Sequence, residues 1–310
     1  MALYLTEEDV AGLLTIEDAL EAVEGSFRRL AGGGVENRPR YRLGLAGGVM
    51  AVMSAVDSEL GKAGVKTYTA FGYDDVRFVV LLFEAKRADL AAIIEANRLG
   101  QLRTGAASGV AAKHLARSGA RTLGVFGCGF QAETQVAAIR AALPSIESVV
   151  VYCRTPERLQ RFCEHVGAEP AEAQHEVGAQ DIVVTATTSR DPVLRGDWLR
   201  PGALVCAIGA NDPGARELDN NVLERAAFVC CDSREQSMLE SGDLIDPVAQ
   251  GVLDWLEVHE LHEVVAEDVP GRQADDDIVL FKSNGIAAWD VAIGAAALDR
   301  AREKGVGKEL

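Results

Sequence analysis

The sequence is poor in positive charge and has no long hydrophobic run. Its 310 residues include 31 Lys and Arg against 47 Asp and Glu, which gives a net charge of −16. Nucleic acids and anionic membranes are bound through basic faces, so we expect neither as a partner. No apolar run reaches the roughly 18 residues of a membrane span, and the opening residues MALYLTEEDV lack the basic and apolar regions of a secretory signal. These absences predict a cytoplasmic protein.

Patterns typical of metal sites and disulfide frameworks are also missing. The six cysteines include no C-x-x-C pair and several lie in predicted strands, which predicts reduced, buried thiols. The five histidines include no H-x-x-x-H or H-E-x-x-H pattern. His259 and His262 lie three residues apart, but one face of a helix explains that spacing. We therefore predict no metal site.

The hydrophobic pattern changes near residue 118. Before it, Thr6 to about Ala31 is predicted to be helical, with Thr6 and Thr15, each followed by acids, as N-terminal caps. Short apolar runs between residues 41 and 83 predict antiparallel strands. Residues 87–117 are rich in Ala and predicted to be helical. After it, continuous apolar runs alternate with helical segments, which is typical of parallel strands buried on both faces.

We therefore predict an α/β fold with two domains. A doubly wound Rossmann sheet is expected in residues 118–287, and an N-terminal α+β domain in residues 1–117. An Ala-rich helix near the end of the chain is expected to return to the first domain, so that residues 288–310 complete it. With 48% hydrophobic residues, the chain is long enough to bury two separate cores.

The segment LGVFGCGFQAETQ places two glycines at a predicted strand-to-helix turn. Gly127, Gly129 and Ala132 fit the dinucleotide-binding pattern G-x-G-x-x-G/A. The first glycine makes the tight turn and the second lets the backbone approach a pyrophosphate. Phe130 and Gln131 begin the helix, whose unpaired N–H groups favour phosphate. A plain glycine-rich loop is the alternative interpretation.

The end of the next predicted strand bears on which dinucleotide binds. An NAD-preferring site usually has Asp or Glu there for the ribose 2′-hydroxyl, whereas an Arg accommodates a 2′-phosphate. The strand Ser148–Tyr152 is followed by Cys153, Arg154 and Thr155, with no acid at the tip. We predict NADP(H) as the preferred cofactor and NAD(H) as the alternative. In that alternative Arg154 is solvated and Thr155 only caps the helix that begins at Pro156.

Several segments together resemble the ornithine cyclodeaminase and mu-crystallin family, over essentially the whole chain. The most specific are LRTGAASG and GARELD, the latter followed by DSREQ. The full set is PRYRL (39–43), GVKTY (64–68), QLRTGAASGVAAKHLA (101–116), GCGFQA (127–132), VVTATTSRDPVL (183–194), AIGANDPGARELD (207–219), DSREQSMLESGDL (232–244) and LFKSNGIAAWD (280–290). The resemblance implies a homodimer with a substrate-binding and dimerisation domain and a Rossmann domain. It also implies hydride transfer between a nicotinamide and the α-carbon of a small amino or imino acid.

The resemblance further implies a carboxylate-binding cluster at Arg40, Lys66 and Arg103. A guanidinium can hold a carboxylate with two parallel hydrogen bonds, and a Lys offers a point charge and a transferable proton. The role of Arg40 is ambiguous, because strand alternation would put Arg38, Arg40 and Arg42 on one face of the strand. The alternative interpretation is that the three form a solvated basic edge. Lys66 either points outward from its strand or is buried among apolar residues. Burial would lower its pKa toward that of a useful proton donor.

Further cofactor contacts are implied at the segments that match the family. Arg103 and Thr104 are expected to begin a helix whose small residues let substrate and cofactor come close. Thr185 and Thr187 end a predicted strand at the carboxyl edge of the sheet, where ligands bind in doubly wound folds. The other implied contacts are Ile208, Gly209 and Ser283. The alternative interpretation of each of these contacts is that it is only a turn residue.

The sequence departs from the cyclodeaminases of the family at two positions. A strand Glu and a loop Asp, which hold and deprotonate the substrate's side-chain amine there, correspond here to Ala51 and Asn211. An amide takes up no proton at neutral pH, so ring closure would need Asp212 as the base. We therefore predict an NAD(P)H-dependent imino-acid reductase or amino-acid dehydrogenase, with Lys66, Arg103, Asn211 and Asp212 as its catalytic residues. An ornithine cyclodeaminase is the first alternative, and a non-catalytic NADPH-binding protein is the second.

Overall fold

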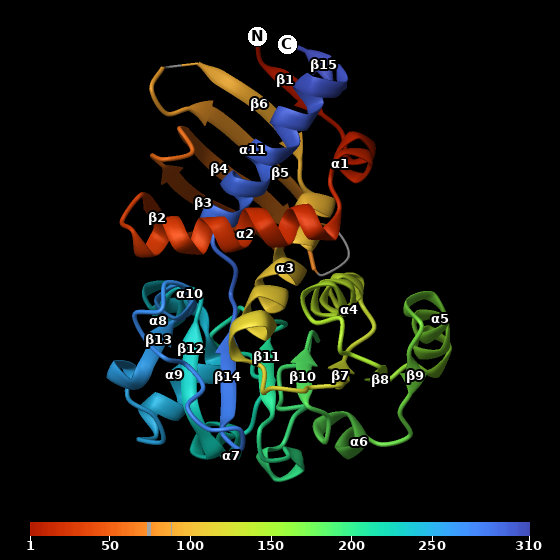
Figure 1. Ribbon diagram of the computed structural model, residues 1–310. Coiled ribbons are helices and arrows are strands. Elements are labelled where there is room, and N and C mark those ends of the chain that lie inside the picture. The colour runs from red at the N-terminus through yellow and green to blue at the C-terminus, as the bar shows by residue number, and fades with distance from the viewer. Residues whose placement is uncertain (73–75, 88) are drawn as a thin grey trace. The chain divides into compact units, whose positions relative to one another are not determined.

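The structure, a computed structural model, describes residues 1–72, 76–87 and 89–310 and divides into two compact units (Figure 1). Unit 1 comprises Met1–Arg103 and Gly285–Leu310, and unit 2 comprises Thr104–Asn284. The first division falls inside helix α3 (Asn97–Leu115), whereas the sequence suggested a boundary at residue 117. Because α3 is one continuous helix, the hydrophobic pattern does not change at residues 103–104, and the sequence therefore does not mark the division there.

Unit 1 is built on a seven-stranded sheet in the order β15-β1-β6-β5-β4-β3-β2. Strands β2 to β6 pair antiparallel in sequence order, as the predicted hairpins require for β2 to β5, and β1 pairs parallel with β6. The strands are β1 (Leu3–Leu5), β2 (Val35–Leu45), β3 (Gly48–Asp57), β4 (Lys62–Ala70), β5 (Val76–Glu84), β6 (Leu90–Glu95) and β15 (Lys308–Glu309).

The described part of unit 1 also contains the helices α1 (Glu7–Leu13), α2 (Ile16–Ala31) and α11 (Ala287–Lys304) and the first residues of α3. Thr6 and Thr15 each close a capping box at the start of α1 and α2, so both helices begin where the sequence predicts. Helix α11 packs against α2 and against β2 to β5 (Figure 1). Its Trp289 meets Phe27 of α2 edge-on, with ring centroids 5.3 Å apart. The C-terminal helix therefore returns to the first unit.

The predicted helix over residues 87–117 is partly wrong. Leu90–Glu95 forms strand β6, which pairs with both β1 and β5, and the helix begins only at Asn97. The two alanines of the run LAAIIE favour a helix locally, but pairing along both edges of the segment outweighs this helical preference. Ala88, inside the predicted helix, lies outside the described residues.

Unit 2 contains an eight-stranded parallel sheet in the order β13-β12-β14-β11-β10-β7-β8-β9. The part β9-β8-β7-β10-β11 follows the Rossmann strand order, in which the chain reverses direction across the sheet between β7 and β10. The strands are β7 (Thr122–Phe126), β8 (Ser148–Tyr152), β9 (Glu169–Pro170), β10 (Ile182–Thr185), β11 (Leu204–Ala207), β12 (Ala226–Cys231), β13 (Val258–Glu260) and β14 (Ile278–Lys282). The fold class predicted from the sequence is confirmed.

Helices flank this sheet and connect its strands (Figure 1). They are α4 (Phe130–Ala142), α5 (Pro156–Val166), α6 (Gln174–Gly178), α7 (Asn220–Arg225), α8 (Arg234–Glu240), α9 (Gly242–Ala249) and α10 (Leu261–Val265), with short 3₁₀ turns η1 (Gly196–Trp198) and η2 (Trp255–Glu257). Every residue of β10, β11 and β14 is buried, which explains their unbroken apolar runs. Among the described residues, no helix is both long enough and apolar enough to span a bilayer.

Candidate functional site

Unit 1 brings two of the predicted cations together around one buried carboxylate. Lys66 comes from β4 and Arg103 from α3, and Asp290 reaches them from α11. The Lys66 Nζ lies 2.9 Å and the Arg103 Nε 3.3 Å from the same oxygen, Asp290 Oδ1. The Lys66 side chain is 2% exposed and that of Asp290 is 1% exposed. Lys66 therefore points inward, and its outward-pointing alternative is excluded.

Burial changes the acid–base chemistry of Lys66. Its pKa is lowered to about 8, first by burial and then by the positive charge of Arg103, while Asp290 acts in the opposite direction. The Nζ also lies 4.7 Å from the centroid of the Phe78 ring. A lysine in this state can give up a proton near neutral pH, which an ordinary lysine does not do.

Arg40 is buried while its two basic neighbours are exposed. The register between β2 and β3 shifts between Arg38 and Tyr41, so a bulge interrupts the strand alternation there. The Arg40 Nε lies 3.3 Å from the Met53 sulfur, and its Nη2 donates to the carbonyl of Gly285 at 3.4 Å. Arg38 instead pairs with Glu36 at the surface. The expectation that Arg38, Arg40 and Arg42 share one face is thus wrong, and Arg40 alone of the three is buried.

Arg103 and Thr104 do not begin a helix, contrary to expectation. Helix α3 starts at Asn97, so both residues lie well inside it. Both are buried, at 8% and 6% exposure. The sequence missed the true start because Asn97 follows directly on strand β6, in a segment predicted to be helical throughout.

Asp290 is a site residue that sequence reasoning did not single out. Its Oδ1 contacts Lys66 and Arg103, and its Oδ2 is buried without a hydrogen-bond partner among the described residues. The available signal was an acid in the Ala-rich segment GIAAWD, because a buried helix face seldom carries an unpaired carboxylate.

In unit 2 the glycine turn has the geometry expected of a phosphate-binding loop. Gly127 has φ +108°, and a Cβ there would collide with the carbonyl of Ala186, so only glycine fits. Gly129 is the N-cap of α4, and no side chain caps this helix end. Phe130 is exposed, while Gln131 Oε1 is buried without a partner among the described residues. These residues fit the pyrophosphate of a dinucleotide, since the helix end and an amide are available to it.

Arg154 and Thr155 follow β8 and are both exposed. Thr155 occupies the N-cap position of α5, but its side chain makes no capping hydrogen bond. The helix start is instead favoured by Pro156 in the first turn. Arg154 and Thr155 thus follow directly on the end of the strand β8 and are open to solvent there.

Two of the six cysteines differ from the prediction of reduced, buried thiols. Cys128, in the glycine turn, and Cys153, after β8, form a disulfide with their Cα atoms 5.8 Å apart, and both are half-buried. Parallel pairing of Phe126 with Tyr152 places the two following segments side by side. The other cysteines, Cys163, Cys206, Cys230 and Cys231, are free and buried as expected.

The predicted contacts after β10 and β11 are engaged by a buried acid, Glu217. Thr185 and Thr187 donate their hydroxyls to its carboxylate, and Gly209 donates its N–H. Burial and then the neighbouring Asp243 raise the pKa of Glu217, while Lys282 and hydrogen bonds from Thr187 oppose this. Ile208 is buried beside them.

Ser283 is likewise buried and donates to Asp232 Oδ2 at 2.9 Å. Asn211 and Asp212 are exposed in the loop after β11, and Asp212 Oδ1 accepts the N–H of Gly214 at 2.8 Å. These residues belong to unit 2, whereas Lys66 and Arg103 belong to unit 1. Within residues 1–72, 76–87 and 89–310, no group of three or more His, Cys, Asp and Glu side chains is arranged to hold a metal ion.

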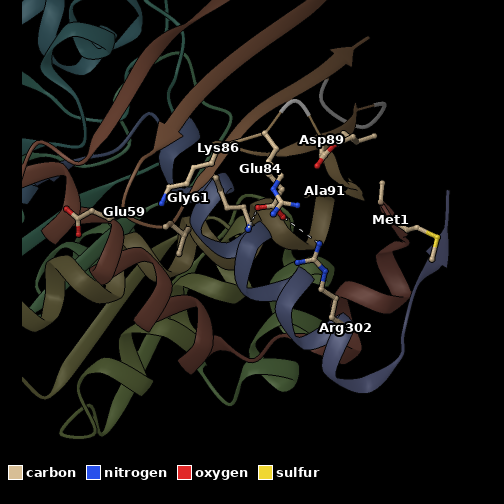
Figure 2. Close-up of a pocket in the computed structure, with 13 residues that line it drawn as sticks. Met1, Glu59, Gly61, Glu84, Lys86, Asp89, Ala91 and Arg302 are labelled. Carbon is tan, nitrogen blue, oxygen red and sulfur yellow. Dashed lines mark hydrogen bonds and ion pairs between the residues drawn. The ribbon is translucent and has the colours of Figure 1, made fainter.

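A cavity in unit 1 is separate from these residues. It has a volume of about 790 Å³ and lies beside the start of β4, the end of β5 and the start of β6 (Figure 2). Glu84 in its wall pairs with Lys62 at 2.8 Å and with Arg302 at 3.6 Å. None of the predicted site residues lines it.

Together, the parallel sheet order and the glycine turn define a Rossmann-type α/β protein, and a second unit holds a buried cluster of cations around Asp290. The model of the ornithine cyclodeaminase/mu-crystallin family matches residues 2–305, and the chain belongs to this family.

Relatives and solved structures cover the chain almost completely. The alanine dehydrogenase of Archaeoglobus fulgidus is 33% identical, with 99% of this chain and 98% of the relative aligned. The Δ1-pyrroline-2-carboxylate reductase of Paracoccus denitrificans is 34% identical over 94% and 95% of the two chains. The structure of the Thermococcus litoralis Δ1-pyrroline-2-carboxylate reductase with NADH and L-proline superposes with a TM-score of 0.94, at 32% identity and over 99% and 100% of the chains.

Proposed function

We propose that the protein is an NAD(P)H-dependent imino-acid reductase or amino-acid dehydrogenase. It transfers hydride at the α-carbon of a small amino or imino acid, and the nicotinamide supplies that hydride. The observation that carries the proposal is the buried set Arg40, Lys66 and Arg103, with Asp290 the carboxylate that contacts the last two. Relatives that align over nearly the whole chain are named as enzymes of this chemistry, which supports it.

The side chains divide the remaining work between them. Arg40 and Arg103 hold the substrate carboxylate, because guanidinium groups pair with carboxylates through parallel hydrogen bonds. Lys66 protonates the imine nitrogen on reduction, since its lowered pKa of about 8 makes it a donor at neutral pH. Burial of all three excludes water and strengthens their interaction with the anion.

The dinucleotide is held by the turn from Gly127 to Gly129 and by the amino end of α4. Thr104, Thr185, Thr187, Ile208, Gly209 and Ser283 are proposed as further contacts. For the ribose end, NADP(H) is preferred to NAD(H). The Arg154 guanidinium and the Thr155 hydroxyl, which makes no capping hydrogen bond, suit a 2′-phosphate. Related structures are described with NADH or NAD, so titration of both coenzymes is the decisive test.

Reduction is favoured over cyclodeamination by the loop after β11. Asn211 replaces the expected acid, and Asp212 already accepts the N–H of Gly214 within its own turn. An aspartate used in this way would have to leave the turn in order to act as a base. Asn211 and Asp212 are therefore proposed to hydrogen-bond the substrate nitrogen or side chain rather than to deprotonate an amine.

The protein is further proposed to act as a cytoplasmic homodimer. A related archaeal alanine dehydrogenase, 33% identical with a TM-score of 0.93, is described as a dimer. Large apolar side chains are exposed on β2 and just beyond β4, at Tyr41, Leu43 and Phe71. Exposed apolar side chains of this size support a surface that is covered in an assembly.

The test is oxidation of NADPH and NADH with a panel of imino acids. The panel contains 2-oxo acids with ammonium or methylamine, and cyclic ketimine carboxylates, and ammonia release from ornithine is measured in parallel. Rapid oxidation with one imino acid is expected and would name the substrate class. Ammonia release from ornithine without net coenzyme change would replace the proposal by cyclodeamination, and binding of NADPH without turnover of any substrate would indicate a binding protein.

A further inference from the structure

The carboxylate of Glu217 is the centre of a buried hydrogen-bond network in unit 2. Glu217 is fully buried. Its Oε1 accepts the N–H and the hydroxyl of Thr187, each at 2.7 Å. Its Oε2 accepts the Thr185 hydroxyl at 2.9 Å and the N–H groups of Gly209 at 2.6 Å and Ala210 at 3.2 Å. All of these donors point at one anion.

These donors belong to two segments that are distant in sequence. Thr185 and Thr187 end β10 and begin the next loop, while Gly209 and Ala210 lie in the loop after β11. Strands β10 and β11 are parallel neighbours, and β10 pairs with β7 on its other side. In doubly wound folds, ligands bind outside the carboxyl ends of the strands at the reversal between β7 and β10. Glu217 therefore ties together two loops at the ligand edge of the sheet.

The approach between the two loops is too close for an ordinary side chain. A Cβ on residue 209 would collide with the backbone of Thr187 and with the Glu217 carboxylate. Glycine at this position lets the loop lie directly on the acid. The two loops therefore lie against each other directly beside the Glu217 carboxylate.

A second pair of buried charges holds Glu217 from behind. Asp243 Oδ1 accepts the N–H groups of Glu217 at 2.7 Å and Leu218 at 3.0 Å. Lys282 Nζ lies 3.0 Å from Asp243 Oδ2 and donates to the carbonyl of Ala210 at 2.6 Å. Ala210 is therefore held at its N–H by Glu217 and at its carbonyl by Lys282. The residue that follows it is Asn211.

Fully buried charges of this kind are a poor source of stability, because desolvation offsets most of their attraction. Apolar side chains would fill the same volume at no such cost. The hydrogen bonds of these buried charged groups instead fix the path of the chain from Gly209 to Asn211 and from Thr185 to Thr187.

We propose that Glu217 is a positioning residue that sets the loops after β10 and β11 to receive the nicotinamide half of the dinucleotide. The inference rests on the proposed function for the identity of the ligand. Glu217 itself touches neither substrate nor hydride. It acts through the two loops and through Asn211.

The isosteric variant Glu217→Gln tests the role without changing side-chain volume. A carboxamide has one acceptor oxygen, so its NH₂ group must face either the donors of Thr187 or those of Gly209 and Ala210. One loop then loses its anchor. We expect Kd for NADPH and NADH to rise about 10- to 100-fold, as for the loss of hydrogen bonds to a charged group. At saturating coenzyme, kcat should recover toward the wild-type value more than kcat/KM does.

Asp181→Asn is the matched control at the opposite edge of the same sheet. Asp181 Oδ2 accepts the N–H groups of Arg121 at 2.8 Å and Thr122 at 3.1 Å, at the amino end of β7. Its loss should lower Tm without changing Kd for either coenzyme. If Glu217→Gln does not fold, Asp243→Asn weakens the support behind Glu217 without changing a proposed coenzyme contact, and it is expected to raise Kd a few-fold.

Coenzyme binding is measured by calorimetry in the absence of any imino acid, together with thermal unfolding. Binding by Glu217→Gln as tight as that of the wild type would overturn the inference, as would equal weakening by Asp181→Asn. If the wild type binds neither coenzyme, the proposed function fails together with the inference. If the wild type binds a coenzyme and Glu217→Gln binds it equally tightly, the inference fails while the proposed function stands.

Discussion

Lys66 Nζ and Asp290 Oδ1 lie 2.9 Å apart although the two residues are separated by 224 positions in the chain. Both side chains are almost completely buried, and Arg103 approaches the same carboxylate oxygen. A lone buried lysine would lose its proton, and a lone buried aspartate would gain one. The pair keeps Lys66 chargeable while burial and Arg103 hold its pKa at about 8.

The first prediction concerns pH. For imine reduction Lys66 must carry a proton, so kcat/KM should be constant below pH 8 and should fall tenfold per pH unit above it. Asp290 raises the pKa of Lys66, so Asp290→Asn should move this descending limb to lower pH. The measurement is a pH–rate profile for both proteins with the same imino acid. An unshifted limb in the variant would remove Lys66 from the role of proton donor.

The second prediction separates the buried arginine from its exposed neighbour. Arg40→Met should raise KM for the imino acid about 10- to 100-fold, because a charged contact to the carboxylate is lost. Arg38→Met removes the same charge two residues away at a surface pair with Glu36 and should leave KM unchanged. Steady-state kinetics with saturating coenzyme measure both. Equal effects would mean that general surface charge, rather than a specific contact, attracts the substrate.

The third prediction concerns coenzyme choice. Arg154→Ser should weaken NADPH binding about 10- to 100-fold and leave NADH binding within a factor of about two, because only NADPH carries the 2′-phosphate. Arg161→Ser, on the exposed face of α5, is the control and should change neither affinity. Fluorescence titration gives all the constants. A wild-type protein that binds NADH as tightly as NADPH would contradict the predicted preference.

The fourth prediction concerns the cysteines. Protein isolated without reductant and then unfolded should show the four thiols of Cys163, Cys206, Cys230 and Cys231, and reduction should reveal all six. The Cys128–Cys153 bond closes a short segment, with a separation of 25 residues. Its reduction should therefore lower the free energy of unfolding by up to about 3 kcal/mol. Thiol titration and denaturant unfolding test this, and six thiols without reductant would show that the pair is reduced in the isolated protein.

Local patterns in the sequence were sufficient for much of the fold. The capping residues Thr6 and Thr15 mark the start of two helices, and the turn at Gly127 fits one type of strand-to-helix connection. These features depend on neighbours in the chain, so they can be read from the sequence. The strand Leu90–Glu95 could not, because its pairing with β1 and β5 overrides the helical preference of its alanines.

The candidate site shows the same division. The cations Arg40, Lys66 and Arg103 were identified from the motifs that contain them, and burial of all three is consistent with their predicted clustering. The choice of Arg40 over Arg38 and Arg42 needed the bulge in β2, which shifts the register in a way that strand alternation does not predict.

The sequence by itself determined the α/β class of the fold, the glycine turn and the set of charged residues available for catalysis. Only the tertiary structure decided which acids those residues meet. Asp290 and Glu217 gain their roles from segments far away in the chain, since a carboxylate becomes a site residue only when folding removes it from water and surrounds it with donors.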